Sequence, residues 1–297
     1  MTEVKNISMD ELAKGFREQN YIADKEILTT VHLALKLNKP LLLEGDAGVG
    51  KTEISKVLAA VFDTDLIRLQ CYEGLDENKA LYEWNYQRQL LKIQMQQECS
   101  SNEALEDDLF SKEYLLERPL LKAIQADKAP VLLIDEVDKT DEEFEAFLLE
   151  VLSDFTVSVP ELGTIQAKEI PIVVLTSNNE RELSDGLKRR CIYLYLNYPT
   201  VEKEKQIISS KIPGIEEKLT DQIAKALQII REDEQFRKKP SIAETLDWTR
   251  ALMALDADKL DPDLVRSTMN LLFKTKEDID HFHENIGAEK LCADAGK

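Results

Sequence analysis

The sequence predicts an α/β fold in which a parallel five-stranded sheet is sandwiched by helices and followed by an all-helical domain. Short apolar runs of strand length alternate with segments of helical period. A glycine-rich loop follows the first of these strands, directly before a helical segment. After Pro199 the strand signal ends and only helical periods recur. We therefore expect an α/β domain over 1–198 and a helical domain over 199–297.

The expected strands are short runs rich in apolar residues. They lie at 40–44, 65–70, 131–135, 170–176 and 191–196. Helical periods occupy 22–37, 52–62, 112–127, 140–153 and 181–188 in the first domain, and 201–211, 216–233, 241–254 and 262–273 in the second. We expect the last dozen residues to fray.

Two insertions interrupt the alternation of strands and helices. The first, near 71–97, is rich in aromatic residues and glutamine. The second, near 155–168, alternates apolar and polar residues around Gly163, which predicts a hairpin before the fourth strand. Each insertion either covers a sheet edge or serves the function.

Composition and charge exclude several classes of protein. The 297 residues contain 38 Lys and Arg against 57 Asp and Glu, a net charge of −19 that repels nucleic-acid backbones and anionic lipids. No apolar run approaches the roughly 20 residues that cross a membrane, and the first residues lack a signal-peptide pattern, so we expect a cytoplasmic protein. Cys71, Cys99, Cys191 and Cys292 are scattered and are expected to be reduced.

The glycine-rich loop matches the pattern G-x-x-x-x-G-K-[ST] between a strand and a helix. Its glycines allow successive backbone N–H groups and the helix N-terminus to point at phosphate oxygens. Its lysine would reach the β- and γ-phosphates, and its threonine hydroxyl would bind Mg²⁺. The loop therefore predicts binding of ATP with Mg²⁺. The expected binding residues are Gly45, Asp46, Ala47, Gly48, Val49, Gly50, Lys51 and Thr52.

Two acids end the third expected strand, at the carboxyl edge of a parallel sheet where ligands bind. Such a pair often only caps the next helix, but together with the lysine loop it predicts chemistry. Asp135 would hold Mg²⁺, with Thr52 as the other metal ligand, and Glu136 would polarise the water that attacks the γ-phosphate.

Polar residues also follow the fourth strand and precede the fifth. Asn178 would lie beside the Asp135–Glu136 strand end and position the attacking water, although Asx residues after a strand commonly form turns. A basic cluster containing Arg189 and Arg190 either pairs with surrounding acids or supplies an arginine that stabilises transition-state charge, in a ring at the neighbouring subunit's site.

In this order the motifs resemble the core of an AAA+ ATPase, a P-loop NTPase with a helical lid, over nearly the whole chain. The Thr176-Ser-Asn178 strand end and the hairpin before it resemble the MoxR family. Four further segments are similar to the branch linked to maturation of carbon monoxide dehydrogenase. They lie at 68–75, 82–90, 187–193 and 240–248.

This resemblance implies strand order 5-1-4-3-2, a homo-oligomeric ring that is usually hexameric, and ATP at the subunit interfaces. It also implies chaperone-like remodelling, in which a client enzyme is matured by insertion of a metal or cofactor. The protein would act together with a partner that bears a von Willebrand factor A domain. Asn178 matches the family's sensor asparagine. Arg190 matches the arginine finger, with Arg189 as the alternative.

One departure from the family pattern is that Glu244 occupies the lid position nearest to the arginine that touches the γ-phosphate in many members. Arg250, one to two turns later, could replace it. Two other functions therefore stay open: a nucleotide-gated scaffold with slow turnover, and a nucleic-acid motor of the same superfamily. His281 and His283, two residues apart on a helix, do not share a face, which favours a structural over a metal-binding role.

Overall fold

The computed structural model describes residues 7–96, 111–160 and 162–297. Internal contacts group the chain into two compact units. The first contains Met1–Gly15, Lys25–Glu44 and Thr52–Tyr195, and the second contains Phe16–Asp24, Gly45–Lys51 and Leu196–Lys297. Across these described ranges, no helix combines the length and the apolar character needed to span a membrane.

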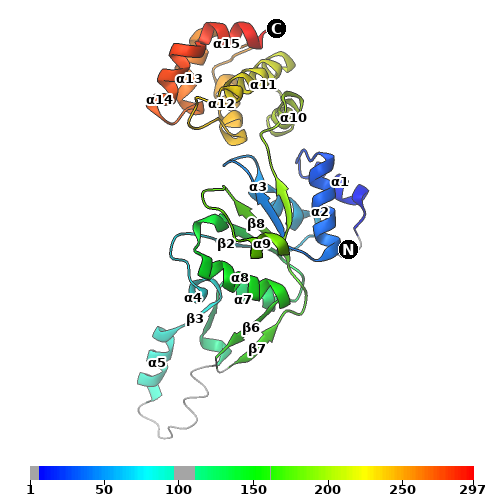
Figure 1. Cartoon of the computed structure of the whole chain (residues 1–297), viewed down its shortest axis with the longest axis vertical. Coiled ribbons are helices and arrows are strands. Elements are labelled where there is room, and N and C mark those ends of the chain that lie inside the picture. Colours follow the sequence, from blue (N-terminus) through cyan, green and yellow to red (C-terminus); the bar gives the residue numbers. More distant parts are fainter. Residues whose placement is uncertain (1–6, 97–110, 161) are drawn as a thin grey trace. The chain divides into compact units, whose positions relative to one another are not determined.

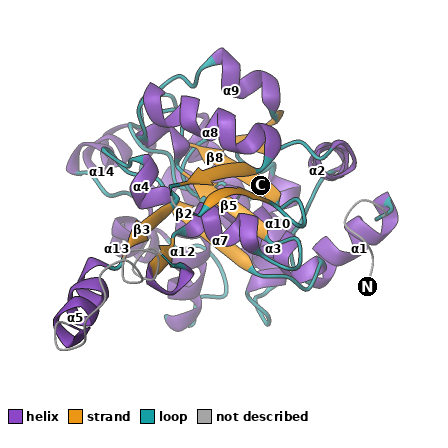
Figure 2. Cartoon of the chain, turned by 90° about the horizontal axis from the view of Figure 1, so that it is seen from below, coloured by secondary structure: helices purple, strands orange, loops and turns teal. Residues whose placement is uncertain are grey.

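The first unit is built on a five-stranded parallel sheet, whose strands are drawn in orange in Figure 2. Its strands run in the order β2-β5-β8-β1-β9, which is the order 5-1-4-3-2 implied by the family resemblance. All five strands begin and end within two residues of the predicted bounds. They are β1 (Leu41–Glu44), β2 (Leu66–Gln70), β5 (Val131–Asp135), β8 (Ile172–Ser177) and β9 (Ile192–Tyr195).

Helices cover both faces of this sheet, which explains why its central strands are buried at every position. On one face, Ile134 and Leu175 share a core with α7 (Pro119–Gln125) and α8 (Glu142–Asp154). Towards the other face, α2 (Lys25–Leu37) and α3 (Lys51–Val61) line a small cavity with the first residues of β1 and β8. The carboxyl ends of the strands are therefore held in register by two packed layers.

Both insertions in the first unit contain a hairpin, and Figure 1 shows them at its lower end. The predicted hairpin is confirmed as β6 (Thr156–Val159) and β7 (Gly163–Gln166). Within the expected 71–97 lie α4 (Glu77–Ala80), β3 (Tyr82–Trp84) and α5 (Tyr86–Gln96), and the strand that pairs with β3 lies beyond this range, where a 3₁₀ turn (Lys112–Tyr114) leads into β4 (Leu115–Glu117).

The helix expected over 112–127 is wrong at its start, since only α7 is helical. Leu115 is buried and pairs with Trp84 across the β3–β4 hairpin, so a long-range contact decides that segment. The helix expected over 181–188 begins late, as α9 (Asp185–Arg190), because residues 178–184 form a loop held by side chains.

In the second unit the expected helices are α10 (Val201–Lys211), α11 (Glu217–Glu232), α12 (Ile242–Ala254) and α13 (Pro262–Leu272). The chain continues through α14 (Lys276–His281), a π turn (Phe282–Ile286) and α15 (Ala288–Ala295). The expectation that the last dozen residues fray is wrong. Leu291 is fully buried, because α15 packs its apolar face against the core of this unit. A further helix, α1 (Met9–Glu18), lies near the N-terminus.

Candidate active site

The glycine-rich loop between β1 and α3 has the backbone that its sequence requires. Gly48 has φ of +78°, and a Cβ on it would come within 2.4 Å of the Ser241 Cβ, so only glycine fits. The Lys51 side chain is buried and folds back over its own loop, donating to the backbone oxygens of Gly45 at 2.6 Å and Asp46 at 2.8 Å. A phosphate would offer this ammonium group stronger acceptors than neutral carbonyls.

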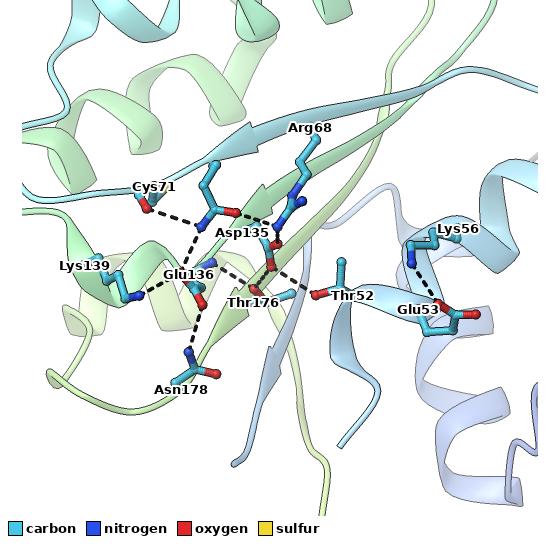
Figure 3. Close-up of polar contacts among 11 residues, drawn as sticks. Thr52, Glu53, Lys56, Arg68, Cys71, Asp135, Glu136, Lys139, Thr176 and Asn178 are labelled. Atoms are coloured by element: carbon cyan, nitrogen blue, oxygen red, sulfur yellow. Dashed lines mark hydrogen bonds and ion pairs between the residues drawn. The ribbon is translucent and has the colours of Figure 1, made fainter. Parts of the chain in front are cut away.

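Asp135, the last residue of β5, joins the first residues of α3 to the end of β8 (Figure 3). Its Oδ1 accepts from the hydroxyl of Thr52 at 3.2 Å and from that of Thr176 at 2.5 Å. Its Oδ2 accepts from the guanidinium of Arg68 on β2. The side chain is only 5% exposed, so this ion pair compensates a buried negative charge.

Carboxylate and hydroxyl oxygens are the ligands that Mg²⁺ prefers. The Asp135 and Thr52 oxygens meet across a single hydrogen bond. This donor set therefore fits a magnesium ion. Among the residues that the structure describes, no cluster of three or more His, Cys, Asp and Glu residues is arranged to hold a metal on protein ligands alone.

Glu136 follows Asp135 and adopts the left-handed backbone conformation, with φ of 59°. Its N–H donates to the Thr176 hydroxyl at 2.9 Å, so one threonine orients both acids. Its carboxylate, 32% exposed, accepts from Asn178 Nδ2 at 3.3 Å, Gln70 Nε2 at 2.9 Å and Lys139 Nζ at 2.8 Å. Figure 3 shows Asn178 and Lys139 converging on Glu136.

These contacts bring together Thr52, Asp135, Glu136 and Asn178, as expected from strands whose carboxyl ends meet at one edge.

Glu136 raises the pKa of Lys139 through their hydrogen bond and opposite charge. Cys71 lies buried just beyond β2. Burial, followed by the negative charges of Asp135, Asp138 and Glu136, raises the pKa of its thiol to about 12.

Further predicted residues lie on α9 and α12. Arg189 and Arg190 are exposed at the end of α9 and make no hydrogen bond or ion pair with any residue in the described ranges. Glu244 accepts from the Ser241 backbone at 2.7 Å and completes a capping box at the start of α12. Arg250 is exposed and pairs with Asp247 on its own helix.

The structure describes the surroundings of His281 and of three cysteines. His281 contacts Asp233 at 2.9 Å and packs edge-on against Phe236. Cys71 and Cys191 are buried, Cys292 is partly buried, and all three are free thiols. Cys99 lies outside the described residues.

Sequence reasoning missed Arg68, Gln70, Lys139 and the role of Thr176. For Arg68 and Gln70 the sequence does contain a signal. These two polar residues alternate with buried residues on β2, so they point away from its core face. The position of β2 beside β5 decides that they meet Asp135 and Glu136.

Residues 40–191 match the model of the AAA domain, dynein-related subfamily, which is just over half of the chain. The chain belongs to this family. The matched range runs from the residue before β1 to the residue before β9, and it contains the glycine-rich loop, both acids, Asn178 and the α9 arginines.

Curated relatives include uncharacterized proteins of Staphylococcus aureus strains bovine RF122 / ET3-1 and NCTC 8325 / PS 47. Each is 25% identical over 241 residues, covering 78% of this chain and 82% of the relative. Among solved structures, a substituted variant of Thermotoga maritima RuvB has a TM-score of 0.50 at 17% identity, covering 95% of this chain and 80% of that one. The T. maritima RuvB Holliday junction branch migration motor has a TM-score of 0.49. The likeness to these structures concerns the fold alone.

Proposed function

We propose that this AAA protein hydrolyses ATP and uses the energy to remodel a partner protein, as a MoxR-type chaperone. The observation that carries the proposal is the convergence of Thr52, Asp135, Glu136 and Asn178 at the carboxyl edge of the sheet. A carboxylate beside an amide, next to a hydroxyl and a second carboxylate, is what attack of water on a magnesium-bound phosphate requires.

The proposed roles follow from the chemistry of each group. Backbone N–H groups of residues 45–52 would bind the phosphates, and Lys51 would exchange its two carbonyl contacts for phosphate oxygens. Bound Mg²⁺ would neutralise phosphate charge, held on the Thr52 and Asp135 side chains. Glu136 would accept the proton of a water whose oxygen bonds to the γ-phosphorus, while the bond to the ADP oxygen breaks. Asn178 would orient that water.

Arg190 is the proposed finger for the neighbouring subunit's site, with Arg189 as the alternative. Their exposure, and their lack of partners within the described ranges, support a role outside their own subunit. A homo-oligomeric ring, hexameric in the usual family pattern, would then contain the active sites. We further propose residues 1–198 as the nucleotide-binding domain, 199–297 as the lid, a cytoplasmic location, and a von Willebrand factor A domain partner that presents a client enzyme.

A nucleotide-gated scaffold is the second candidate, and one observation favours it. Glu136 accepts hydrogen bonds from three donors at once, so its carboxylate oxygens are already engaged where they would accept from the attacking water. Slow turnover until a partner releases Glu136 would follow. A nucleic-acid motor is disfavoured by the net charge of −19.

The test is Mg²⁺-dependent ATP hydrolysis as a function of protein concentration, with particle mass measured in the same samples. We expect specific activity to rise as rings form, and Glu136→Gln to bind ATP but lose about 100-fold or more in turnover. Undiminished turnover in Glu136→Gln would refute the assigned base. Tight ATP binding with negligible turnover at every concentration would favour the scaffold.

The shared site is tested by mixing two inactive variants. Arg190→Ala keeps its own Glu136 but lacks the finger, whereas Glu136→Gln keeps the finger. Mixed rings should regain turnover because each Glu136→Gln subunit completes the site of an Arg190→Ala neighbour. If only Arg189→Ala behaves in this way, the finger is Arg189. If neither mixture regains activity, the arginines do not act between subunits.

A further inference from the structure

The loop of residues 178–184 runs from the end of β8 to the start of α9. Its first residue is Asn178, beside Glu136, and the helix that follows ends in Arg189 and Arg190. The loop therefore connects the amide that faces a subunit's own nucleotide with the arginines that would face the next subunit's nucleotide. Two buried carboxylates from the segment after β5 hold the two ends of this loop, and neither has a place in the proposed chemistry.

Asp138 holds the first end. Its side chain is 3% exposed, and its Oδ2 accepts from the backbone N–H of Asn178 at 3.0 Å and of Glu180 at 2.9 Å. The other oxygen, Oδ1, is buried and has no hydrogen-bond partner among the described residues. Asp138 thus fixes the backbone of Asn178, while Glu136, two residues earlier, contacts its side chain.

Glu145 holds the second end and is 1% exposed. Its Oε2 accepts from the backbone N–H of Ser184 at 2.9 Å, and its Oε1 pairs with the guanidinium of Arg181. Arg181 also donates to the Thr140 backbone oxygen at 2.7 Å. Ser184 is the N-cap of α9, since its Oγ accepts from the Leu187 N–H. Glu145 therefore sets the start of the helix that carries the arginines.

Burying a carboxylate is unfavourable unless hydrogen bonds or an opposite charge compensate it. In the described ranges Asp138 has no ion-pair partner, only main-chain amides of this one loop, so its charge serves to hold the loop. Hydrogen bonds to ionised groups are about twice as strong as neutral ones. Fixed at residues 178, 180, 181 and 184, the loop has little freedom to bend between its ends.

We propose that Asp138 and Glu145 are positioning residues, which make the 178–184 loop a rigid strut between Asn178 and the arginines of α9. The proposal rests on the proposed function, because it needs Asn178 and Arg190 to act in hydrolysis. A displacement of Asn178 on γ-phosphate binding or loss then moves α9, so that one subunit's nucleotide state changes the arginine offered to its neighbour. The direction in which α9 moves determines whether hydrolysis in the neighbouring subunit rises or falls. Asp138 and Glu145 determine whether a displacement of Asn178 reaches α9.

The first arm of the test separates positioning from stability. Asp138→Ala should lower kcat by up to about 100-fold, the scale of a misplaced catalytic group, with KM and Kd for ATP nearly unchanged. Asp138→Asn should recover part of kcat, because its amide oxygen still accepts from the two N–H groups, and it serves as the main variant if Asp138→Ala does not fold.

The matched control is Asp141→Ala. Asp141 also accepts a backbone N–H, that of Phe144 at 2.8 Å, but at the start of α8 rather than on the strut. This variant should lower the melting temperature and keep kcat. If Asp138→Ala and Asp138→Asn both keep the kcat of the unmodified protein, the proposal is wrong.

The second arm tests transmission to α9, using the mixed rings of Arg190→Ala acceptors and Glu136→Gln donors. The donor has no turnover of its own, so added substitutions report only on the finger that it offers. Asp138→Ala or Glu145→Gln in the donor should lower the regained turnover several-fold, whereas Asp141→Ala in the donor should not. The mass of the mixed rings confirms that donors are incorporated.

The outcomes distinguish this inference from the function on which it rests. If the unmodified protein does not hydrolyse ATP, the proposed function fails, and if no mixture regains turnover, the proposed finger role of the arginines fails. If mixtures regain turnover and the donor substitutions at Asp138 and Glu145 leave it unchanged, the function stands and the strut is refuted.

Discussion

Each unit of this protein contains a cluster of buried acids and donors, and the two clusters are satisfied to different degrees. In the second unit, Arg231 is almost wholly buried. It pairs with both oxygens of Glu204, donates to the Pro240 backbone oxygen at 2.8 Å and to Thr245 at 3.1 Å, and stacks on the Tyr198 ring. This network is closed, and it joins α10, α11 and the start of α12.

At the carboxyl edge of the sheet the cluster is open. Glu136 is partly exposed and its donors include a flexible lysine, while Asp138 keeps a buried oxygen without a partner in the described ranges. The contrast indicates that a fully compensated charge network stabilises one arrangement of helices, whereas a partly compensated one is ready to exchange its donors for a ligand. Four predictions test this difference.

The largest effect is expected from Arg231→Ala, which leaves Glu204 buried without its partner. We expect the free energy of unfolding of the second unit to fall by about 3–5 kcal/mol. Urea unfolding would be followed by the fluorescence of Trp248, which is fully buried in this unit, in a Trp84→Phe background that removes the only other tryptophan.

Arg250→Ala is the matched control, because Arg250 forms an exposed pair on α12 and its loss should change stability by less than about 1 kcal/mol. The double substitution of Arg231→Met with Glu204→Leu should restore most of the lost stability. Equal effects of Arg231→Ala and Arg250→Ala would remove the distinction between closed and open clusters.

A smaller loss of stability is expected from Thr176→Val. This substitution removes the hydroxyl that donates to Asp135 and accepts from the Glu136 N–H. The first unit should lose about 1–3 kcal/mol of unfolding free energy, measured by urea unfolding with Trp84 as the probe. Thr164→Val, at an exposed position on β7, should change it by less than about 0.5 kcal/mol. A Thr176→Val protein as stable as this control would mean that water replaces the hydroxyl.

Lys139→Met should raise basal ATP turnover by about twofold to tenfold, because one donor fewer then competes with the attacking water for Glu136 Oε2. The pKa of Lys139 is raised, so its ion pair is complete below the ordinary lysine pKa and is lost only as pH rises through the raised value. The ratio of variant to unmodified turnover should therefore be the same at about pH 7 and about pH 9. Lys56→Met, which removes an exposed pair on α3, is the control. Lower turnover in Lys139→Met would make Lys139 a positioning group for Glu136.

The smallest effect concerns thiol chemistry. Burial raises the pKa values of Cys71 and Cys191 to about 12, so at pH 8 only about one thiol in ten thousand is ionised. Iodoacetamide should label both far more slowly in the folded protein than in urea, as read by peptide mass spectrometry. Cys292, only partly buried, should react faster. Rapid labelling of Cys71 in the folded protein would indicate that the segment after β2 opens.

Particular segments show how far sequence reasoning reaches. Strands β1 and β5 were predictable because each is a continuous apolar run, and for β1 a glycine loop follows. The segment that forms β4 was misassigned to a helix, since its pairing with β3 spans more than thirty residues and leaves no local signal. For α15 the prediction was a frayed end and the structure has a packed helix. Its small apolar residues stand at helical spacing, which is the local signal for that helix.

By itself, the sequence determined the order of strands and helices, the phosphate-binding loop, and the residue types that follow β5 and β8. These depend on local periodicity, on glycine conformations and on side-chain chemistry. Only the tertiary structure decided that Gln70 and Lys139 hold Glu136, that Glu244 caps α12, and that Asp138 and Glu145 fix the 178–184 loop. The physical reason is that a hydrogen bond between distant residues depends on strand order and packing, which no single segment of the chain encodes.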